Sequence, residues 1–182
     1  MTNTKWALDP AHSEIQFKVR HLMVSNVTGH FKTFNAAVET QGDDITTAHV
    51  HFTADVNSIS TNNEQRDAHL KSDDFLDMAN HPELSFDGTG LQHVSDEHYK
   101  MNGVLTLRGV SKEVNLNVEF GGIMQDPWGN TRTGLTVTAK INRKDFGVHF
   151  SMISETGGLL LGDEVSIVAN MEFVKEAVAV PA

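Results

Sequence analysis

The fold class follows from the stretch Glu14-Ile15-Gln16-Phe17-Lys18-Val19-Arg20, in which apolar and polar residues alternate without interruption. Period-two alternation is typical of a β-strand that buries one side and exposes the other. Similar alternation recurs along residues 49–56, 84–87, 98–107, 113–120, 135–141 and 165–173. Parallel strands would instead show continuous apolar runs. The sequence therefore predicts an all-β, antiparallel fold.

Further short segments raise the expected number of strands to about eight to ten. They lie at residues 6–8 and around Phe31 and Val38. This many amphipathic strands can close into a barrel or stack as a sandwich. The order of the apolar faces alone leaves both architectures open.

One segment of the chain departs from the strand pattern. Thr61 and Glu64 have the spacing of a capping box, which predicts a short helix through Lys71, and residues 72–78 predict a second helical turn. Helices this short are not stable alone and must dock. We expect them to plug one end of a barrel with an apolar face formed by Leu70, Phe75, Leu76 and Met78.

The composition excludes several classes of protein. The chain has 182 residues, no cysteine and a formal net charge of −10. This length fits one domain, which we expect at residues 4–175, followed by a flexible C-terminal tail at 176–182. Without cysteine the chain has no disulfides and no thiolate metal site. The negative charge opposes binding to nucleic acid.

Targeting and membrane signals are missing from the sequence as written. No apolar run reaches the roughly 18–20 residues that span a bilayer, so no integral membrane segment is expected. The first residues do not have the pattern of a signal peptide. We therefore expect a cytoplasmic protein, or a periplasmic or secreted one if the native amino terminus has been replaced.

The aromatic residues are strongly biased toward phenylalanine. The chain has 10 Phe, 2 Trp and 1 Tyr. Phenylalanine brings aromatic surface without the polar group of tyrosine or tryptophan. Most of the aromatic side chains are therefore expected in wholly apolar surroundings, and several fall on the inward side of separate predicted strands.

Five blocks of sequence, in order along the chain, resemble the YceI-like family. They are WALDPAHSEIQF at 6–17, RHLMVSNVTGHF at 20–31, RDAHLKSDDF at 66–75, GVLTLRGV at 103–110 and INRKDFG at 141–147. The resemblance implies an elongated, lipocalin-like antiparallel β-barrel of about eight strands that encloses an apolar cavity. It also implies a polyisoprenoid ligand, such as a quinone tail or a prenyl phosphate, and a possible homodimer. It brings no catalytic motif and no required cofactor, so we do not expect an enzyme.

The predicted inward faces supply candidates for the lining of such a cavity. An eight-stranded barrel is about the size that can hold one small ligand, although the same residues could simply fill a core. Methionine adds adaptable apolar surface. The candidates are Phe17, Val19, Phe31, Phe34, Phe52, Leu70, Phe75, Phe86, Met101, Leu105, Leu116, Val118, Phe120, Leu135, Val137, Ile141, Phe146, Ile167 and Met171.

A polar head group would need donors at one end of the barrel. The candidates are His21, Arg66, His69, Arg108 and Arg143, since the arginine fork suits phosphate. Each could instead be a structural tie. For Arg66, Asp67 and His69 we favour that structural role, with Asp67 and His69 bonding loop backbone at the barrel rim.

Three other interpretations stay open at this stage. A cofactor-free isomerase or cyclase would need an ionisable group with a shifted pKa inside the cavity. A cupin-like metalloprotein could use His49 and His51, which point the same way on one strand but on the side expected to face solvent. The glycine-rich loop 151–162 is either a lid that touches the ligand through Met152, Leu159 and Leu160 or a plain hairpin connection.

Overall fold

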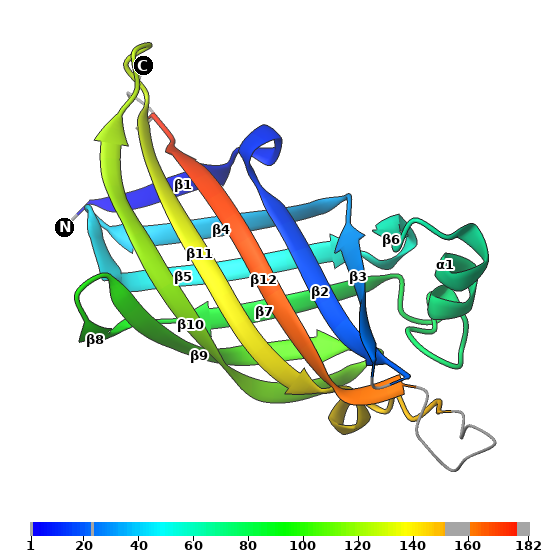
Figure 1. The fold of residues 1–182 in the computed structure, drawn as a ribbon. Coiled ribbons are helices and arrows are strands. Elements are labelled where there is room, and N and C mark those ends of the chain that lie inside the picture. Colours follow the sequence, from blue (N-terminus) through cyan, green and yellow to red (C-terminus); the bar gives the residue numbers. More distant parts are fainter. Residues whose placement is uncertain (1, 23, 152–160, 178–182) are drawn as a thin grey trace.

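The structure, a computed structural model, describes residues 2–22, 24–151 and 161–177. Its strands are joined by short turns and by a few helical segments (Figure 1). The strands are β1 (Asn3–Leu8), β2 (Glu14–His21), β3 (Ser25–Phe31), β4 (Phe34–Gln41), β5 (Asp44–Asp55), β6 (Ile59–Ser60), β7 (Glu83–Thr89), β8 (Gln92–Ser95), β9 (His98–Leu107), β10 (Val110–Gln125), β11 (Thr131–Asn142) and β12 (Leu161–Lys175). The helices are α1 (Glu64–Lys71) and the single-turn segments η1 (Pro10–His12), η2 (Val56–Ser58) and η3 (Arg143–Phe146).

Eight of the strands close into a barrel. Their order is β1-β4-β5-β7-β9-β10-β11-β12, and β1 also pairs with β12, so the sheet returns to its first strand. Every pairing is antiparallel, as in β10 with β11 and β11 with β12. The predicted antiparallel barrel of about eight strands is confirmed, and the sandwich alternative is excluded.

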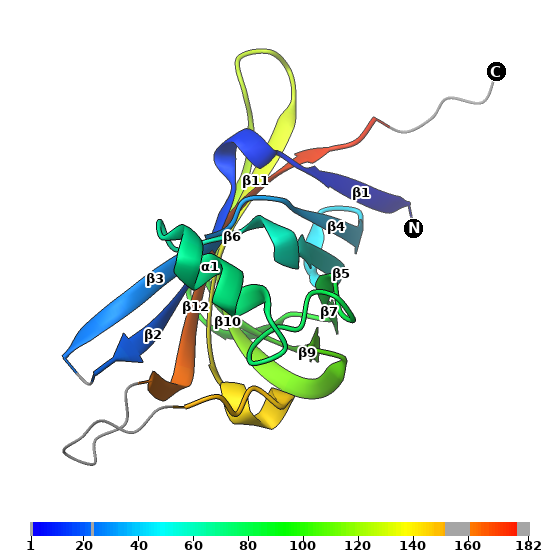
Figure 2. The same cartoon turned by 90° about the vertical axis from the view of Figure 1, so that its right-hand side faces the viewer.

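The barrel wall splits where the chain passes from β1 to β2. The carboxyl-terminal part of β12 pairs with β1, whereas its amino-terminal part pairs with β2. Between them, η1 turns the chain at Pro10, and the Asp9 side chain accepts a hydrogen bond from the Ala11 amide at 3.0 Å. Strands β2 and β3 therefore leave the wall as a flap, which Figure 2 shows from the α1 side.

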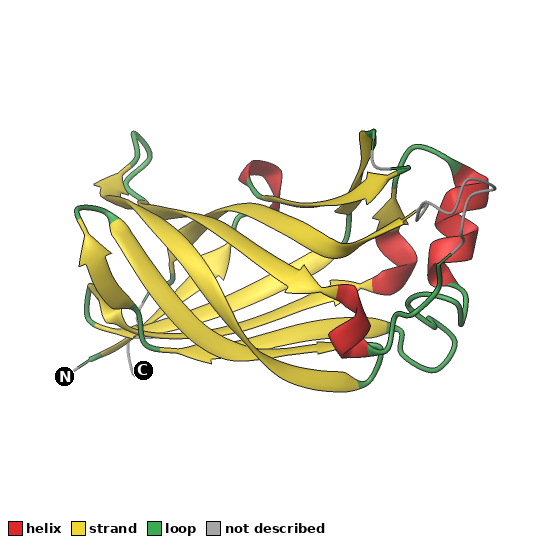
Figure 3. Ribbon diagram, turned by 60° about the horizontal axis from the view of Figure 1, so that its bottom comes forward, coloured by secondary structure: helices red, strands yellow, loops and turns green. Residues whose placement is uncertain are grey.

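Helix α1 lies at one end of the barrel (Figure 3). The predicted capping box is wrong, because the residue that caps α1 is Asn63, whose side chain accepts a hydrogen bond from the Arg66 amide at 2.9 Å. Thr61 is instead bound to the Asp67 carboxylate through its amide and its hydroxyl. Residues 72–78 form a series of turns rather than a second helix.

The inward face of the barrel carries the apolar core. One continuous cluster of buried residues draws on every strand of the closed barrel except β11 and on β3 of the flap, and Leu135 and Val137 of β11 are partly buried and pack against it. No helix of the described residues is long and apolar enough to cross a membrane.

Two segments named in the sequence analysis fall largely outside the described residues. These are the loop 151–162, of which residues 152–160 are not described, and the tail 176–182, of which residues 178–182 are not described. The loop contains the three proposed lid residues, Met152, Leu159 and Leu160. Strand β12 begins at Leu161, so residues 161 and 162 of the predicted loop belong to this strand.

Candidate functional site

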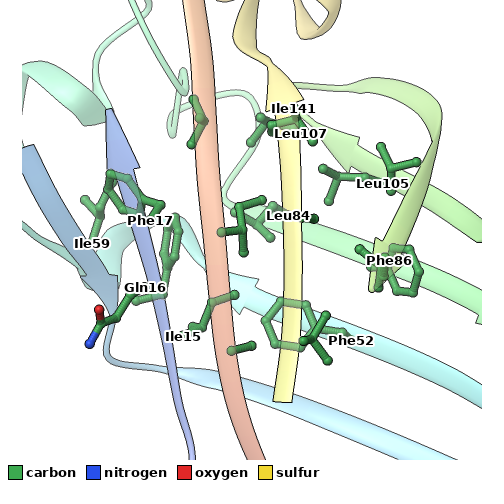
Figure 4. A pocket seen from close by; sticks show the side chains of 18 of the residues that line it. Ile15, Gln16, Phe17, Phe52, Ile59, Leu84, Phe86, Leu105, Leu107 and Ile141 are labelled. Carbon is green, nitrogen blue, oxygen red and sulfur yellow. The ribbon is translucent and has the colours of Figure 1, made fainter. Parts of the chain in front are cut away.

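An apolar cavity of about 450 Å³ lies inside the barrel. This volume is within the range of about 300–1,000 Å³ that small-molecule sites usually have. Its wall combines inward residues of the closed barrel with residues of β2, β3 and α1. Figure 4 shows part of this wall, with Phe17 of β2 near barrel residues such as Leu84. No Asp or Glu side chain lines the part of the wall that the structure describes.

The structure places all but three of the predicted lining residues on this wall. Except for Leu70 on α1 and Phe75 in the turns after it, they alternate along their strands with outward polar residues, which is why the strand pattern identified them. They are Phe17, Val19, Phe31, Phe52, Leu70, Phe75, Phe86, Met101, Leu105, Leu116, Val118, Leu135, Val137, Ile141, Ile167 and Met171.

Phe34, Phe120 and Phe146 do not line the cavity. Phe34 starts β4, packs 6.1 Å from the ring of Phe52 and lines a separate surface groove. Phe120 has the inward phase of β10, but it lies beyond the last wall residue of that strand and packs edge-on against Tyr99 at 6.3 Å. Phe146 belongs to η3 and is only 1% exposed, so it packs beneath that turn.

Sequence reasoning missed part of the wall, including large apolar residues such as Val50 and Leu84 that have the inward phase of their strands. Alanines such as Ala36, Ala48, Ala139 and Ala169 also face the cavity and are buried. Strand alternation could have found Ala139 and Ala169. Phe150 follows η3 and carried no strand signal.

Of the five head-group candidates, His21, Arg66, His69 and Arg143 line the cavity and Arg108 does not. The lining four come together at the α1 end. Arg66 and His69 lie on α1, and His21 ends β2 opposite Leu161. The cavity therefore has one end with basic and imidazole side chains, and apart from Gln16 the rest of its wall is apolar.

Arg108 has a structural role and does not act as a head-group donor. It occupies the tight turn between β9 and β10 with a positive φ of 52°. Its Nη1 donates to the backbone carbonyls of Asp73 and Phe75, the latter at 2.7 Å. Arg108 thus fastens the chain after α1 to the barrel, and that contact could not be read from local sequence.

Arg143 is also committed to the backbone. It is 4% exposed, and its Nε donates to Gly162 O at 2.8 Å while Nη1 donates to the carbonyls of Val148 and Phe150. Its Nη2 lies 3.7 Å from Asp163 Oδ1 and makes no hydrogen bond to the described atoms. Burial lowers the pKa of Arg143, against the attraction of Asp163. Its position braces the start of β12 against η3.

The other three polar residues keep donor capacity free toward the cavity end. Arg66 is exposed and uses Nε and Nη2 on Thr61, at 2.8 and 2.6 Å, which leaves Nη1. His69 Nε2 lies 2.8 Å from Asp74 Oδ2, so it bonds a side chain and not the loop backbone that we expected. Asp67 does bond loop backbone, through the Thr61 amide. His21 makes no side-chain hydrogen bond or ion pair to the described residues.

An aromatic cluster surrounds His69 at this end. The His69 ring packs edge-on against Phe75 at 5.0 Å and against Phe150 at 4.8 Å, and the two phenylalanine rings lie 5.0 Å apart. All three residues line the cavity. The cluster joins α1, the turns after it and the segment after η3 around the polar end.

The two histidines proposed as metal ligands in the metalloprotein alternative do not face the cavity. His49 and His51 are exposed on the outer face of β5, and His51 Nδ1 lies 2.6 Å from Asp87 Oδ1. Among the described residues, the group with metal-like spacing is Asp9, His12 and Glu172. Arg132 donates to both of these carboxylates, at 2.8 and 3.1 Å, so a guanidinium already occupies the position of a cation.

A closed antiparallel barrel of eight strands around an apolar cavity defines a lipocalin-like barrel protein. The chain belongs to the YceI-like family, because the YceI-like domain model matches residues 6–173. The five sequence blocks therefore predicted the family correctly.

Relatives and solved structures agree with this assignment. A UPF0312 protein of Staphylococcus aureus strain N315 is 39% identical over 171 residues, which cover 93% of this chain and 97% of that protein. BcnA of Burkholderia cenocepacia has a TM-score of 0.77 at 21% identity and covers 91% of this chain and 98% of its own. A polyisoprenoid binding domain from Saccharophagus degradans has a TM-score of 0.70 at 16% identity, with coverage of 94% and 98%. At these identities the two structures support the fold.

Proposed function

We propose that this chain binds a polyisoprenoid in the barrel cavity and carries or sequesters it. The observation that supports the proposal is the wall of the cavity, which is apolar except for Gln16 on β2 and the polar residues at the α1 end. Membership in the YceI-like family and the likeness to a polyisoprenoid binding domain agree with it. The proposal requires no cofactor and no catalytic group.

Hydrophobic burial supplies the affinity in this proposal. Each methylene moved from water to an apolar wall contributes about 0.8 kcal/mol, so about 20 buried carbons give roughly 16 kcal/mol. The cost of association is about 4–15 kcal/mol. A long hydrocarbon chain can therefore bind without a hydrogen bond along its length.

The polar head of the ligand is assigned to the α1 end. His21, Arg66 and His69 line the cavity there and keep donors that no structural bond uses. Because Arg66 and His69 are exposed, their contribution to affinity is small compared with burial of the chain. Their role is to orient the ligand, with the tail running into the barrel.

A matched pair of tryptophan variants tests this function. Val137→Trp on β11 fills the cavity, whereas Thr138→Trp places the same ring on the outer face of the same strand. Fluorescence titration with a long polyprenol and with the corresponding polyprenyl phosphate gives the affinities. We expect Val137→Trp to weaken binding of both by at least about tenfold, through overpacking of about 1–3 kcal/mol, and Thr138→Trp to leave it unchanged.

A second variant separates the contribution of the head group from that of the hydrocarbon tail. Arg66→Gln should reduce the preference for the phosphate over the alcohol and leave alcohol binding as it is. If the wild-type protein takes up neither probe, or if both tryptophan variants bind like the wild type, the cavity is not the lipid site.

A further inference from the structure

Three glycines stand at inward positions of the flap and of the barrel strands, where the alternating pattern would place a large apolar side chain. They are Gly29 on β3, Gly88 on β7 and Gly103 on β9. None has a positive φ, so the backbone at these positions does not require glycine. Glycine inside a strand otherwise marks a place where another group approaches closely.

A phenylalanine ring occupies the space beside Gly29. Phe17 is the direct cross-strand partner of Gly29. A Cβ atom added to Gly29 would lie 2.2 Å from Cζ of Phe17 and within 3 Å of two more ring atoms. The ring of Phe17 therefore lies along the wall, over the bare backbone of β3, and not straight into the cavity.

The same arrangement occurs at a second place in the wall. Gly88 and Gly103 are direct partners, and the next inward pair along these strands is Phe86 with Leu105. A Cβ atom on Gly88 would lie 2.7 Å from Sδ of Met101 and 2.8 Å from Cε1 of Phe86, whereas one on Gly103 would lie 2.3 Å from Cζ of Phe86 and 2.5 Å from the main-chain oxygen of Asp87. Phe86 thus lies across the glycine pair.

Both rings line the cavity and stand in different parts of it, as Figure 4 shows. A methyl group at any of the three glycines would overlap the ring, so the ring would have to rotate or move away from the wall. The free direction is the cavity. These glycines therefore control how much of the cross-section the two rings occupy.

We infer that Gly29, Gly88 and Gly103 determine the specificity of the cavity for the girth of its ligand, by holding Phe17 and Phe86 flat so that a methyl-branched chain fits. This inference rests on the proposed function. A chain with a methyl branch at every isoprene unit is wider than a straight alkyl chain. A narrower cavity therefore weakens binding of the branched chain more than binding of the straight chain.

The test compares a branched with a straight chain. Wild type, Gly29→Ala and Gly134→Ala are titrated with a long polyprenol and with a straight-chain alcohol of equal carbon number. Gly134 is the control because it lies on β11, where an added Cβ would meet no atom nearer than Met171 O at 3.8 Å. We expect Gly29→Ala to weaken polyprenol binding by about tenfold or more and straight-chain binding by less than about threefold.

A double variant identifies the ring as the cause. In Gly29→Ala combined with Phe17→Leu, the smaller side chain leaves room for the methyl group, and polyprenol affinity should return to within about threefold of wild type. Gly88→Ala, alone and combined with Phe86→Leu, gives a second pair in another part of the wall, because the nearest atoms to an added methyl group at Gly88 are the ends of the Met101 and Phe86 side chains. This pair carries the test if Gly29→Ala does not fold by circular dichroism.

Each outcome decides the inference. The inference is wrong if the alanine variants lose affinity equally for both alcohols, if they lose none, or if the double variants do not recover polyprenol affinity. In each of these cases, polyprenol binding by the wild type would still support the proposed function. If the wild type binds neither alcohol, the proposed function fails and this inference fails with it.

Discussion

Arg132 shows how a single side chain holds distant parts of the barrel together. Its Nε donates to Asp126 Oδ2 at 2.7 Å, in the turn between β10 and β11. Its Nη1 donates to Asp9 Oδ2 at 2.8 Å, before η1, and to Glu172 Oε2 at 3.1 Å, on β12. The hydrogen bond from Arg132, assisted by His12, lowers the pKa of Asp9 from 3.8 to about 2. Arg132 also lowers the pKa of Asp126.

These shifts predict how stability depends on pH. Because the pKa of Asp9 is lower in the folded than in the unfolded chain, its stabilisation is complete above about pH 4 and disappears as the pH falls toward 2. Arg132→Gln should therefore melt a few degrees below wild type at pH 6, and the difference should shrink toward pH 2. Thermal melts followed by circular dichroism at pH 6, 4 and 2 measure it.

The matched control for Arg132 is Lys140→Gln. This substitution also removes one positive charge, but from an exposed ion pair in which Lys140 Nζ lies 3.7 Å from Glu164 Oε1. Exposed ion pairs contribute little to stability. Its melting temperature should stay close to wild type at every pH. A gap between Arg132→Gln and wild type that stays constant from pH 6 to pH 2 would contradict the proposed linkage.

At the scale of the elements, α1 depends on a cap that the sequence did not single out. The Asn63 side chain accepts from the Arg66 amide, and the helix has only eight residues, Glu64–Lys71. Losing such a cap costs about 1 kcal/mol. Asn63→Ala should lower the free energy of unfolding in urea by about this amount, whereas Gln65→Ala, an exposed change on the same helix, should stay within about 0.5 kcal/mol of wild type. Equal effects of the two variants would show that the cap is not what holds α1.

The strands were far more predictable than the cap of α1 or the way in which the flap leaves the barrel wall. Alternation along Glu14–His21 requires only that one side is buried, and this is a local property of the sequence. The split of β12 between β1 and β2 is set by pairing between residues more than a hundred positions apart. The choice of Asn63 over Thr61 as the cap depends on the Asp67 carboxylate, which binds Thr61. Neither fact follows from the local pattern.

At the scale of the whole molecule, alternation gave the direction of the lining side chains but not the space left between them. Large residues such as Met101 and Leu116 were identified by their phase. The hollow itself depends on small residues and on glycines beneath Phe17 and Phe86, which the search for apolar residues passed over. The arginines Arg108 and Arg143 looked like ligand donors because backbone carbonyls far from them in the sequence, those of Phe75 and Gly162, accept their hydrogen bonds.

The most direct test of the central claim is a measurement of what the barrel holds when it is isolated. The protein, purified without detergent from the cells that make it, is extracted with organic solvent, and the extract is analysed by mass spectrometry beside Val137→Trp and Thr138→Trp. We predict about one polyisoprenoid per chain in the wild type and in Thr138→Trp, and a clear loss in Val137→Trp. A wild-type extract without prenyl lipid, or equal amounts in both tryptophan variants, would contradict the claim that the cavity is a polyisoprenoid site.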